Sequence, residues 1–350
     1  MGLTPLSEVP FNGEASLDAL RSRITPVDDF YVRSNFPEPV LDPGAWRLRV
    51  GGAVDAPREW SLDQLRDLGA SLDRTVTLEC AGNGRSFIEP PVSGTPWTLG
   101  ATGTAVFTGV PLADVLRHAA PQADAVEWCF TGADVGDAGR WGRVPFQRSL
   151  PVEAIAPAPD GPLLAWSMNG RPLTVRHGAP VRLIVPGWYA VASVKWLVGI
   201  DALTAPFEGR FQTDRYLYVR DGRVEGPVER MKVRALILEV TRRAADRVEM
   251  SGIAWSGAAE VTAVEVSTDG GARWSPAELA PAGEAFTRRA WRWSGPAPAA
   301  GGAVWARATD ATGARQPTET WTNDLGYGNN EVHRVPVPPA GDPAGGQPSS

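Results

Sequence analysis

The chain has 350 residues and a mass of 37.3 kDa, more than one hydrophobic core usually organises, so we expect about two domains. Hydrophobic residues make up 43% of the chain and charged residues 21%, which excludes a disordered or fibrous protein. The formal net charge of −6 excludes a global basic field, and we therefore expect no nucleic-acid partner.

Cysteine and histidine usage limits the kinds of metal site. The chain has 2 cysteines, Cys80 and Cys129, which lie far apart and form no CxxC pair. This argues against a disulfide framework, a zinc ribbon or an iron–sulfur site. The 3 histidines, His118, His177 and His333, have no paired spacing, which argues against a multi-histidine metal centre.

The N-terminal sequence does not resemble an export signal, because it has no basic segment followed by an apolar stretch. We expect a cytoplasmic protein, or a periplasmic one if an export leader has been removed. The longest apolar run, Leu183–Val194, is interrupted by Pro186 and Gly187 and is shorter than the ~20 residues of a membrane helix. We therefore expect no membrane span.

The first part of the chain, residues 1–225, alternates β-rich runs with short helical segments. Helices are predicted over Ser61–Leu68, where Ser61 suits an N-cap, and over Pro111–Ala119, where a proline suits the first turn. Asn169 and Gly170 lie between two β-like runs, which predicts a hairpin. The pattern indicates a mixed α+β domain.

The character of the sequence changes after about residue 225. Short β-rich runs follow one another, separated by turn sequences such as Asp269-Gly270-Gly271, and helical periodicity is absent. This spacing predicts an antiparallel β-sandwich of immunoglobulin type over residues 226–337. Residues 338–350 are rich in proline and glycine, which predicts a disordered tail.

The densest local motif is the segment Thr75–Phe87, TVTLECAGNGRSF. Its first half alternates apolar and polar residues, which places Cys80 on the apolar face at the end of a strand. Gly82 and Gly84 then allow a tight turn, and Arg85 favours a thiolate and attracts an anion. A buried structural cysteine is the alternative for Cys80, since most free cysteines are buried.

A second group of polar side chains lies in the segment HGAPVRLIVPGWYAVASVKW. It places His177, Arg182, Ser193 and Lys195 around a Pro-Gly turn, and such donors hold phosphate groups or extended polar rings. Taken singly, His177 suits a satisfied loop histidine and Lys195 a solvated surface cation.

Together with FYVRSNF around Arg33 and TPW at Trp97, these segments resemble the sulfite oxidase family of molybdopterin-dependent oxidoreductases, which includes bacterial sulfite oxidases and sulfane dehydrogenases. The resemblance extends from about Phe30 to Val335. It implies a sulfite-oxidase-type molybdopterin-binding domain of α+β class, followed by an immunoglobulin-like β-sandwich. It also implies a Mo-molybdopterin cofactor with Cys80 as the metal ligand, a role that suits a soft thiolate.

The same resemblance implies roles for further residues. Arg33, Arg85 and Trp97 would border the catalytic pocket, where two guanidinium groups favour small anions. The cofactor-binding residues that it implies are Asn35, Asp134, His177, Arg182, Ser193, Lys195 and Trp196.

The pocket segments also depart from the family pattern. Gly84 stands where sulfite oxidases have the first of two arginines, and Ser93 lies nearest to a lysine of many members. The usual pocket tyrosine corresponds to Phe207, and a third pocket arginine to Asp324 or Leu325. The expectation of sulfite as the substrate therefore rests on the resemblance as a whole and not on these four positions.

The implied function is oxidation of sulfite to sulfate by oxygen-atom transfer, with electrons passed to an external acceptor such as a cytochrome c-like protein. The sandwich resembles the family's dimerisation domain, which implies a homodimer. A sulfane dehydrogenase or a reductase with the same cofactor is the alternative within the family. Alternatives outside it are a cysteine hydrolase, with Cys80 as nucleophile and His177 as base, and a binding protein without enzymatic activity.

Overall fold

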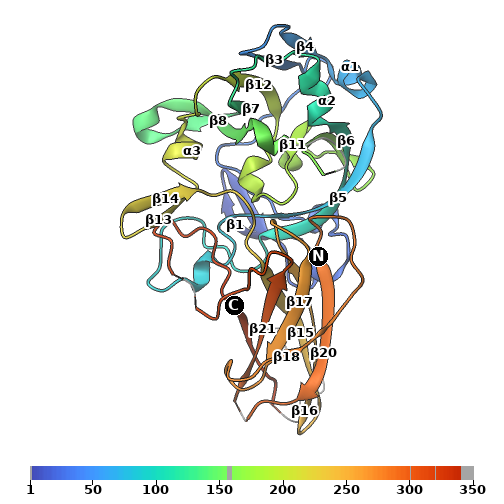
Figure 1. Ribbon diagram of the computed structural model, residues 1–350, viewed down its shortest axis with the longest axis vertical. Helices are drawn as coiled ribbons and strands as arrows, with labels where there is room; N and C mark the ends of the chain where they lie inside the picture. Colours follow the sequence, from blue (N-terminus) through green and yellow to red (C-terminus); the bar gives the residue numbers. More distant parts are fainter. Residues whose placement is uncertain (1, 156–159, 300, 320, 340–350) are drawn as a thin grey trace. The chain divides into compact units, whose positions relative to one another are not determined.

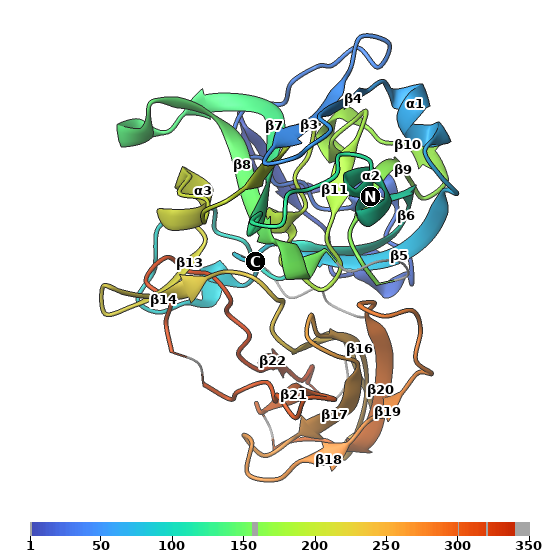
Figure 2. The same ribbon diagram turned by 45° about the horizontal axis from the view of Figure 1, so that its top comes forward.

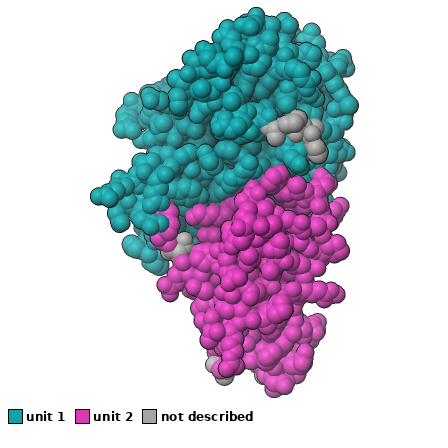
Figure 3. All heavy atoms as spheres, in the orientation of Figure 1, with its two compact units in different colours: residues 1–19, 24–230, 322–329 teal, residues 20–23, 231–321, 330–350 magenta. Residues whose placement is uncertain are grey.

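The computed structural model describes residues 2–155, 160–299, 301–319 and 321–339. Figure 3 colours its two compact units: unit 1 comprises residues 1–19, 24–230 and 322–329, and unit 2 comprises residues 20–23, 231–321 and 330–350. Segment 322–329 thus belongs to unit 1 although it follows most of unit 2 in sequence. The domains predicted from the sequence are continuous, so this return to unit 1 was not predicted. Of the predicted tail at 338–350, residues 340–350 lie outside the described part.

Unit 1 contains two larger sheets among its described residues (Figure 1). In the first sheet, antiparallel strands follow the order β10, β9, β6 and β5, and β11 also pairs with β9. The bounds of these strands are β5 (Leu72–Glu79), β6 (Thr102–Pro111), β9 (Leu163–Met168), β10 (Arg171–Pro172) and β11 (Arg182–Ile184).

The second sheet of unit 1 has the order β4, β3, β12, β7 and β8, and it is mixed because β12 pairs in parallel with β3. Its strands are β3 (Leu48–Gly52), β4 (Arg58–Trp60), β7 (Glu127–Asp137), β8 (Arg143–Pro151) and β12 (Leu197–Leu203). Two further strand pairs are hairpins, namely β1 (Thr4–Glu8) with β2 (Phe11–Glu14), and β13 (Leu217–Arg220) with β14 (Arg223–Pro227).

The helices of unit 1 are short. Helix α1 (Leu62–Asp67) begins after Ser61, whose hydroxyl accepts from the Gln64 amide while the Gln64 side chain accepts from the Ser61 amide, a capping box. Helix α2 (Leu112–Arg117) begins after Pro111, so both predicted helices are confirmed. No helix among the described residues is both long and apolar enough to cross a membrane. The remaining helical segments are α3 (Arg210–Thr213) and the 3₁₀ turns Ala19–Arg21, Val27–Asp29, Arg85–Phe87, Gly139–Trp141, Val152–Ala154, Val175–His177 and Ala190–Ala192.

The predicted hairpin at Asn169 and Gly170 joins β9 to β10. Both residues have positive φ angles, 52° and 74°, which a two-residue type I′ turn requires. The Asn169 side chain also accepts a hydrogen bond from the Val106 amide at 2.9 Å and donates one to the Thr25 carbonyl at 3.0 Å. The hairpin prediction is therefore confirmed, and the amide ties the turn to strand β6.

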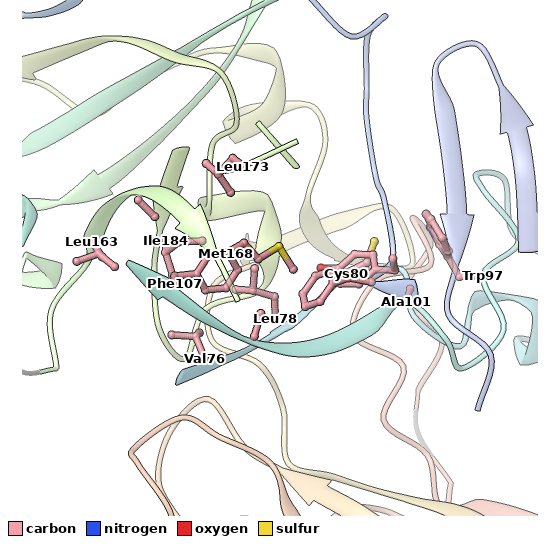
Figure 4. Packing of buried hydrophobic residues seen from close by; sticks show 14 residues of the cluster. Val76, Leu78, Cys80, Trp97, Ala101, Phe107, Leu163, Met168, Leu173 and Ile184 are labelled. Carbon is pink, nitrogen blue, oxygen red and sulfur yellow. The ribbon is translucent and has the colours of Figure 1, made fainter. Parts of the chain in front are cut away.

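Strand β5 leads the core of unit 1 to the candidate site. Val76 and Leu78 on this strand are fully buried, and Cys80, directly after its end, is 5% exposed. All three belong to one hydrophobic cluster, and Figure 4 shows Cys80 in it close to Ala101. The predicted placement of these side chains on one face is confirmed.

Unit 2 is a β-sandwich of two antiparallel sheets among its described residues, drawn in orange and red in Figure 2. The orders are β15, β16, β20, β19 in one sheet and β18, β17, β21, β22 in the other, and one hydrophobic cluster draws on both. This confirms the predicted immunoglobulin-like fold. The strands are β15 (Arg234–Ala244), β16 (Arg247–Trp255), β17 (Val261–Ser267), β18 (Ser275–Pro276), β19 (Glu278–Leu279), β20 (Arg289–Pro296), β21 (Ala303–Asp310) and β22 (His333–Pro336).

One histidine of unit 2 is held in its neutral form. Nδ1 of His333 on β22 accepts a hydrogen bond from the Ile237 amide at 3.0 Å, which requires an unprotonated ring nitrogen. Burial, with a smaller contribution from the charge of Arg234, lowers the pKa of His333 from 6.5 to about 3. The folded state therefore binds fewer protons than the unfolded state between these two values.

We expect the free energy of unfolding to decrease as the pH falls from about 6.5 towards 3, because the unfolded chain gains the proton that folded His333 excludes. In His333→Gln part of this pH dependence should disappear. Urea unfolding followed by tryptophan fluorescence measures it, and exposed His118→Gln is the matched control. An unchanged pH dependence in His333→Gln would contradict the expectation.

Candidate active site

A cavity in unit 1 brings together most of the residues predicted for the site. Its empty space is about 660 Å³ when the part open to solvent is included. The predicted residues that line it are Arg33, Asn35, Cys80, Asp134, His177, Arg182, Ser193, Lys195 and Trp196. Arg85 and Trp97 are not among the lining residues.

The loop that carries Cys80 is fixed by backbone and amide hydrogen bonds. The Cys80 amide donates to the Ala101 carbonyl at 2.8 Å, and the Cys80 carbonyl accepts from the Asn83 amide at 2.9 Å. The buried side chain of Asn83 donates to the Glu79 carboxylate at 3.0 Å and accepts from the Ala101 amide at 3.2 Å. These bonds join the loop to Ala101, the residue directly before β6, and Cys80 lines the cavity.

The Cys80 thiol lies between opposing influences on its pKa. Burial raises this pKa, while the charges of Arg33 and Arg85 and the Gly82 amide work in the opposite direction, and the net shift is upward. The free thiol is therefore protonated at neutral pH. Cys80 would have to lose this proton to bind a thiophilic metal ion, and the two arginines would favour its thiolate.

Arg33 faces the cavity from the segment after the 3₁₀ turn Val27–Asp29. Its guanidinium donates to the amide oxygens of Asn12 at 3.2 Å and Asn35 at 2.6 Å, and to the Ser34 carbonyl. Asn35 in turn donates to the Tyr216 hydroxyl at 3.2 Å. One cationic side chain and one phenol are thus linked on the same wall as the thiol.

Tyr216 lines the cavity, and the expectation that Phe207 marks the position of the pocket tyrosine was wrong. Phe207 is not a lining residue, and its amide donates a hydrogen bond to the Glu127 carboxylate at 2.9 Å. Tyr216 follows α3 with a φ angle of 58°, and its ring stacks on Tyr327 at 4.9 Å. The sequence shows two tyrosines in DRYLY, but it does not show that the turn after α3 places Tyr216 at the cavity.

Arg85 is enclosed by backbone rather than exposed to the cavity. Its guanidinium donates to the carbonyls of Thr95 at 2.9 Å and Leu325 at 3.5 Å, and lies 5.0 Å from the centre of the Tyr327 ring. A Cβ atom at Gly82 would come within 2.6 Å of Arg85 Nη1, so a larger residue there would have to displace the guanidinium. Arg85 acts on Cys80 through its charge, and its predicted contact with the substrate stays a prediction.

Trp97 is fully buried and also stays a prediction as a pocket residue. Its ring packs edge-on against Tyr31, with centroids 6.4 Å apart, and Tyr31 is a lining residue. Trp97 therefore supports the wall of the cavity from behind.

Sequence reasoning missed how segment 322–329 supports the cysteine loop. The Gly328 amide donates to the Ala81 carbonyl at 2.7 Å, and the Asn329 side chain donates to the Gly84 carbonyl at 2.9 Å. The position expected to hold a third arginine contributes only the Leu325 carbonyl to Arg85. No local pattern in the sequence indicates this pairing of distant segments.

Lys195 supplies a second cationic group to the cavity. Its ammonium donates to the Ser34 hydroxyl and to the Arg176 carbonyl, both at 2.9 Å, and lies 4.1 Å from the centre of the Trp196 ring. Burial lowers the pKa of Lys195 to about 7, and the charge of Asp134 opposes this. Burial raises the pKa of Asp134 to about 6, opposed by Lys195. The two groups stabilise each other's charged forms.

Arg182 supplies a third cationic group. Its guanidinium donates to the carbonyls of His177 at 3.1 Å and Ser193 at 3.3 Å, and burial lowers its pKa to about 10. Nε of Arg182 is buried and has no hydrogen-bond partner within the described part of the chain. The Ser193 hydroxyl accepts from the Val185 amide at 3.0 Å and holds the adjacent loop.

The geometry of His177 does not suit a general base for Cys80. Nε2 of His177 donates to the Val27 carbonyl at 3.1 Å, and burial with the nearby cations Arg182 and Lys195 lowers the pKa of His177 to about 3. Because the pKa of Cys80 is raised as well, neither partner of a thiolate–imidazolium pair is favoured.

The cavity fits a soft metal ion carried by an anionic organic group. Its wall offers one thiol for such a metal, and the described lining residues include four cations, Arg33, Arg176, Arg182 and Lys195, against one carboxylate, Asp134. The buried Nε of the lining residue Arg182, which has no partner among the described residues, would be available to donate to an anionic group. The residues present therefore match the donor set that Mo-molybdopterin requires.

Two family profiles match the chain. The profile "Oxidoreductase molybdopterin binding domain" covers residues 35–211, and "Mo-co oxidoreductase dimerisation domain" covers residues 230–339. The chain belongs to this family of molybdopterin-binding oxidoreductases, and its cofactor is Mo-molybdopterin. The resemblance seen in the sequence is confirmed.

Individual relatives agree with this family. Chicken (Gallus gallus) "Sulfite oxidase" is 35% identical over 77% of this chain, and tomato (Solanum lycopersicum) "Nitrate reductase [NADH]" is 35% identical over 62% of it. The chain spans 62% and 24% of the length of these two proteins. The crystal structure of the sulfane dehydrogenase SoxCD from Paracoccus pantotrophus covers 94% of this chain and 84% of its own, at 27% identity and a TM-score of 0.82.

Lys195→Met should weaken retention of the cofactor by about tenfold in affinity, because it removes a charge-assisted donor and leaves Asp134 opposed by one cation fewer. Molybdenum by plasma mass spectrometry and pterin by fluorescence, both per chain, measure the loss. The other lysine of the chain, Lys232 in unit 2, supplies the control Lys232→Met. Equal cofactor contents in both variants would argue against the assignment of Lys195.

Proposed function

We propose that this protein oxidises sulfite to sulfate, with water supplying the added oxygen atom and two electrons and two protons released. The observation that carries the proposal is that Arg33 and the Cys80 thiol line the same cavity. The name of the chicken relative, "Sulfite oxidase", supports the substrate. The two electrons would pass to an external acceptor.

Different residues of the cavity would hold the metal, the anionic substrate and the pterin. Bound molybdenum supplies a two-electron redox centre, and Cys80 would be its protein ligand. Arg33 would bind and orient the anion, and Tyr216 presents a hydroxyl held by Asn35. The groups that would hold the pterin and its phosphate are His177, Arg182, Ser193, Lys195, Trp196 and Asp134.

The preorganised charge of the wall favours turnover of an anion. Arg33 is fixed by three hydrogen bonds before substrate arrives, so little reorganisation is needed as charge shifts during the reaction. A guanidinium at ~4 Å from a substrate charge contributes about 4 kcal/mol at an effective dielectric constant near 20, before desolvation.

Oxidation of a sulfane sulfur is the second candidate. It is favoured by the extent of the match to SoxCD and by the withdrawal of Arg85 from the cavity, which leaves less positive charge than two exposed arginines would. Parallel assays of sulfite and of sulfane-sulfur donors with a dye acceptor distinguish the two candidates. A cysteine hydrolase is disfavoured by the environment of His177.

The match to a dimerisation domain supports a homodimer built through unit 2. Sedimentation velocity of the full chain tests this assembly, and a monomer at micromolar concentration would contradict it.

Sulfite turnover by protein made in a host that synthesises molybdopterin tests the proposed function. We expect about one molybdenum atom per chain and reduction of ferricyanide that depends on sulfite. Cys80→Ser should lose turnover by several orders of magnitude, while the distant Cys129→Ser should retain it, since Cys129 lies on β7 away from the cavity lining. Loaded wild-type protein that does not oxidise sulfite would contradict the proposal.

Arg33→Met should raise the KM for sulfite by at least about tenfold and reduce the dependence of KM on salt, because Arg33 lines the cavity. Arg85→Met should raise KM less, since its guanidinium is bound to carbonyls outside the lining. Steady-state kinetics at low and high ionic strength compare the two. A larger rise in KM in Arg85→Met than in Arg33→Met would indicate that Arg85, and not Arg33, binds the substrate anion.

A further inference from the structure

The N-terminal hairpin β1–β2 lies before the matched range 35–211 and contacts the segment that carries Arg33. The Gly13 amide donates to the Val32 carbonyl at 3.0 Å, and the Val32 amide donates back to Gly13 at 2.9 Å. These two bonds place Asn12, the residue directly before Gly13, beside the guanidinium of Arg33.

The side chain of Asn12 is 3% exposed and its orientation is fixed by four hydrogen bonds. Oδ1 accepts from Arg33 Nη1 at 3.2 Å and from the Ser34 amide at 2.9 Å. Nδ2 donates to the Ser7 hydroxyl at 2.8 Å and to the Pro10 carbonyl at 3.1 Å. Because both amide protons are occupied within the hairpin, the oxygen must face Arg33.

No carboxylate in the part of the chain that the structure describes accepts a hydrogen bond from Arg33. Its hydrogen-bond acceptors are two amide oxygens, of Asn12 and Asn35, and the carbonyl of Ser34, and none of them is a carboxylate. Among the described residues Arg33 makes no ion pair. Neutral acceptors orient a guanidinium without cancelling the field that it presents to an anion.

Two further contacts anchor the hairpin to the cavity region. The Glu14 carboxylate accepts from the amide and the hydroxyl of Thr98, at 2.9 and 2.7 Å, directly after Trp97. The Phe11 ring lies 3.8 Å from the guanidinium carbon of Arg176, which lines the cavity. The hairpin therefore meets three separate segments of the site and cannot shift with respect to one alone.

We propose that the N-terminal hairpin is part of the substrate site and that Asn12 is a positioning residue for Arg33. Its amide oxygen holds the guanidinium at the cavity wall, and its neutrality leaves the positive charge of Arg33 to a small oxyanion. The oxyanion rests on the proposed function, whereas the positioning rests on the hydrogen bonds of Asn12 alone.

The test compares Asn12→Asp and Asn12→Ala with wild-type holoenzyme, using calorimetric titration with sulfate. A carboxylate at position 12 has nearly the same shape but cancels the field of Arg33, so Asn12→Asp should weaken sulfate binding by at least about tenfold. The KM for sulfite should rise more than kcat falls. The control Gln64→Glu adds a carboxylate at an exposed position outside the cavity lining and should leave sulfate binding within about twofold.

A second measurement does not depend on the substrate. Half-buried Arg33 should react with phenylglyoxal several-fold faster in Asn12→Ala than in wild-type protein or Gln64→Glu, as read by peptide mass spectrometry. Molybdenum content and melting temperature exclude misfolded variants. Unchanged labelling in Asn12→Ala, or unchanged sulfate binding in Asn12→Asp while Arg33→Met binds none, would overturn the proposal. Faster labelling in Asn12→Ala, together with wild-type protein that binds no sulfate, would support the positioning of Arg33 by Asn12. The same result would overturn the claim that Arg33 binds a small oxyanion.

Discussion

A buried thiol next to uncompensated positive charge is the feature on which the rest of the site depends. Burial of Cys80 favours the protonated thiol, and Arg33, Arg85 and the Gly82 amide favour the thiolate. The first influence is stronger, so the net shift of the Cys80 pKa is upward. The position of Cys80 is fixed by strand β5, by the side-chain amide of Asn83 and by segment 322–329.

Much of this arrangement could be predicted where a short segment determines its own shape. The alternation before Cys80, the cap at Ser61 and the turn at Asn169 and Gly170 depend on local stereochemistry, and the structure has all three. The clustering of the cofactor residues was reached through resemblance. No local rule brings the segment around His177 to Cys80.

The errors and omissions arise where distant segments meet. Phe207 and Tyr216 are close in sequence, and only the turn after α3 decides which of them faces the cavity. The role of segment 322–329 depends on the chain returning to unit 1 after most of unit 2 in sequence, and that of Asn12 on the pairing of its hairpin with the segment around Val32. Sequence patterns describe neighbours along the chain, and these contacts join residues that are far apart in it.

The measurement that tests the central claim most directly is the number of sulfur atoms bound to molybdenum, obtained from X-ray absorption at the metal edge. Holoenzyme and Cys80→Ser protein would be compared at equal metal content. The account predicts one sulfur neighbour fewer in the variant, because the cavity offers the Cys80 thiol to the metal. An unchanged number of sulfur neighbours would show that Cys80 does not bind the metal and would contradict the account.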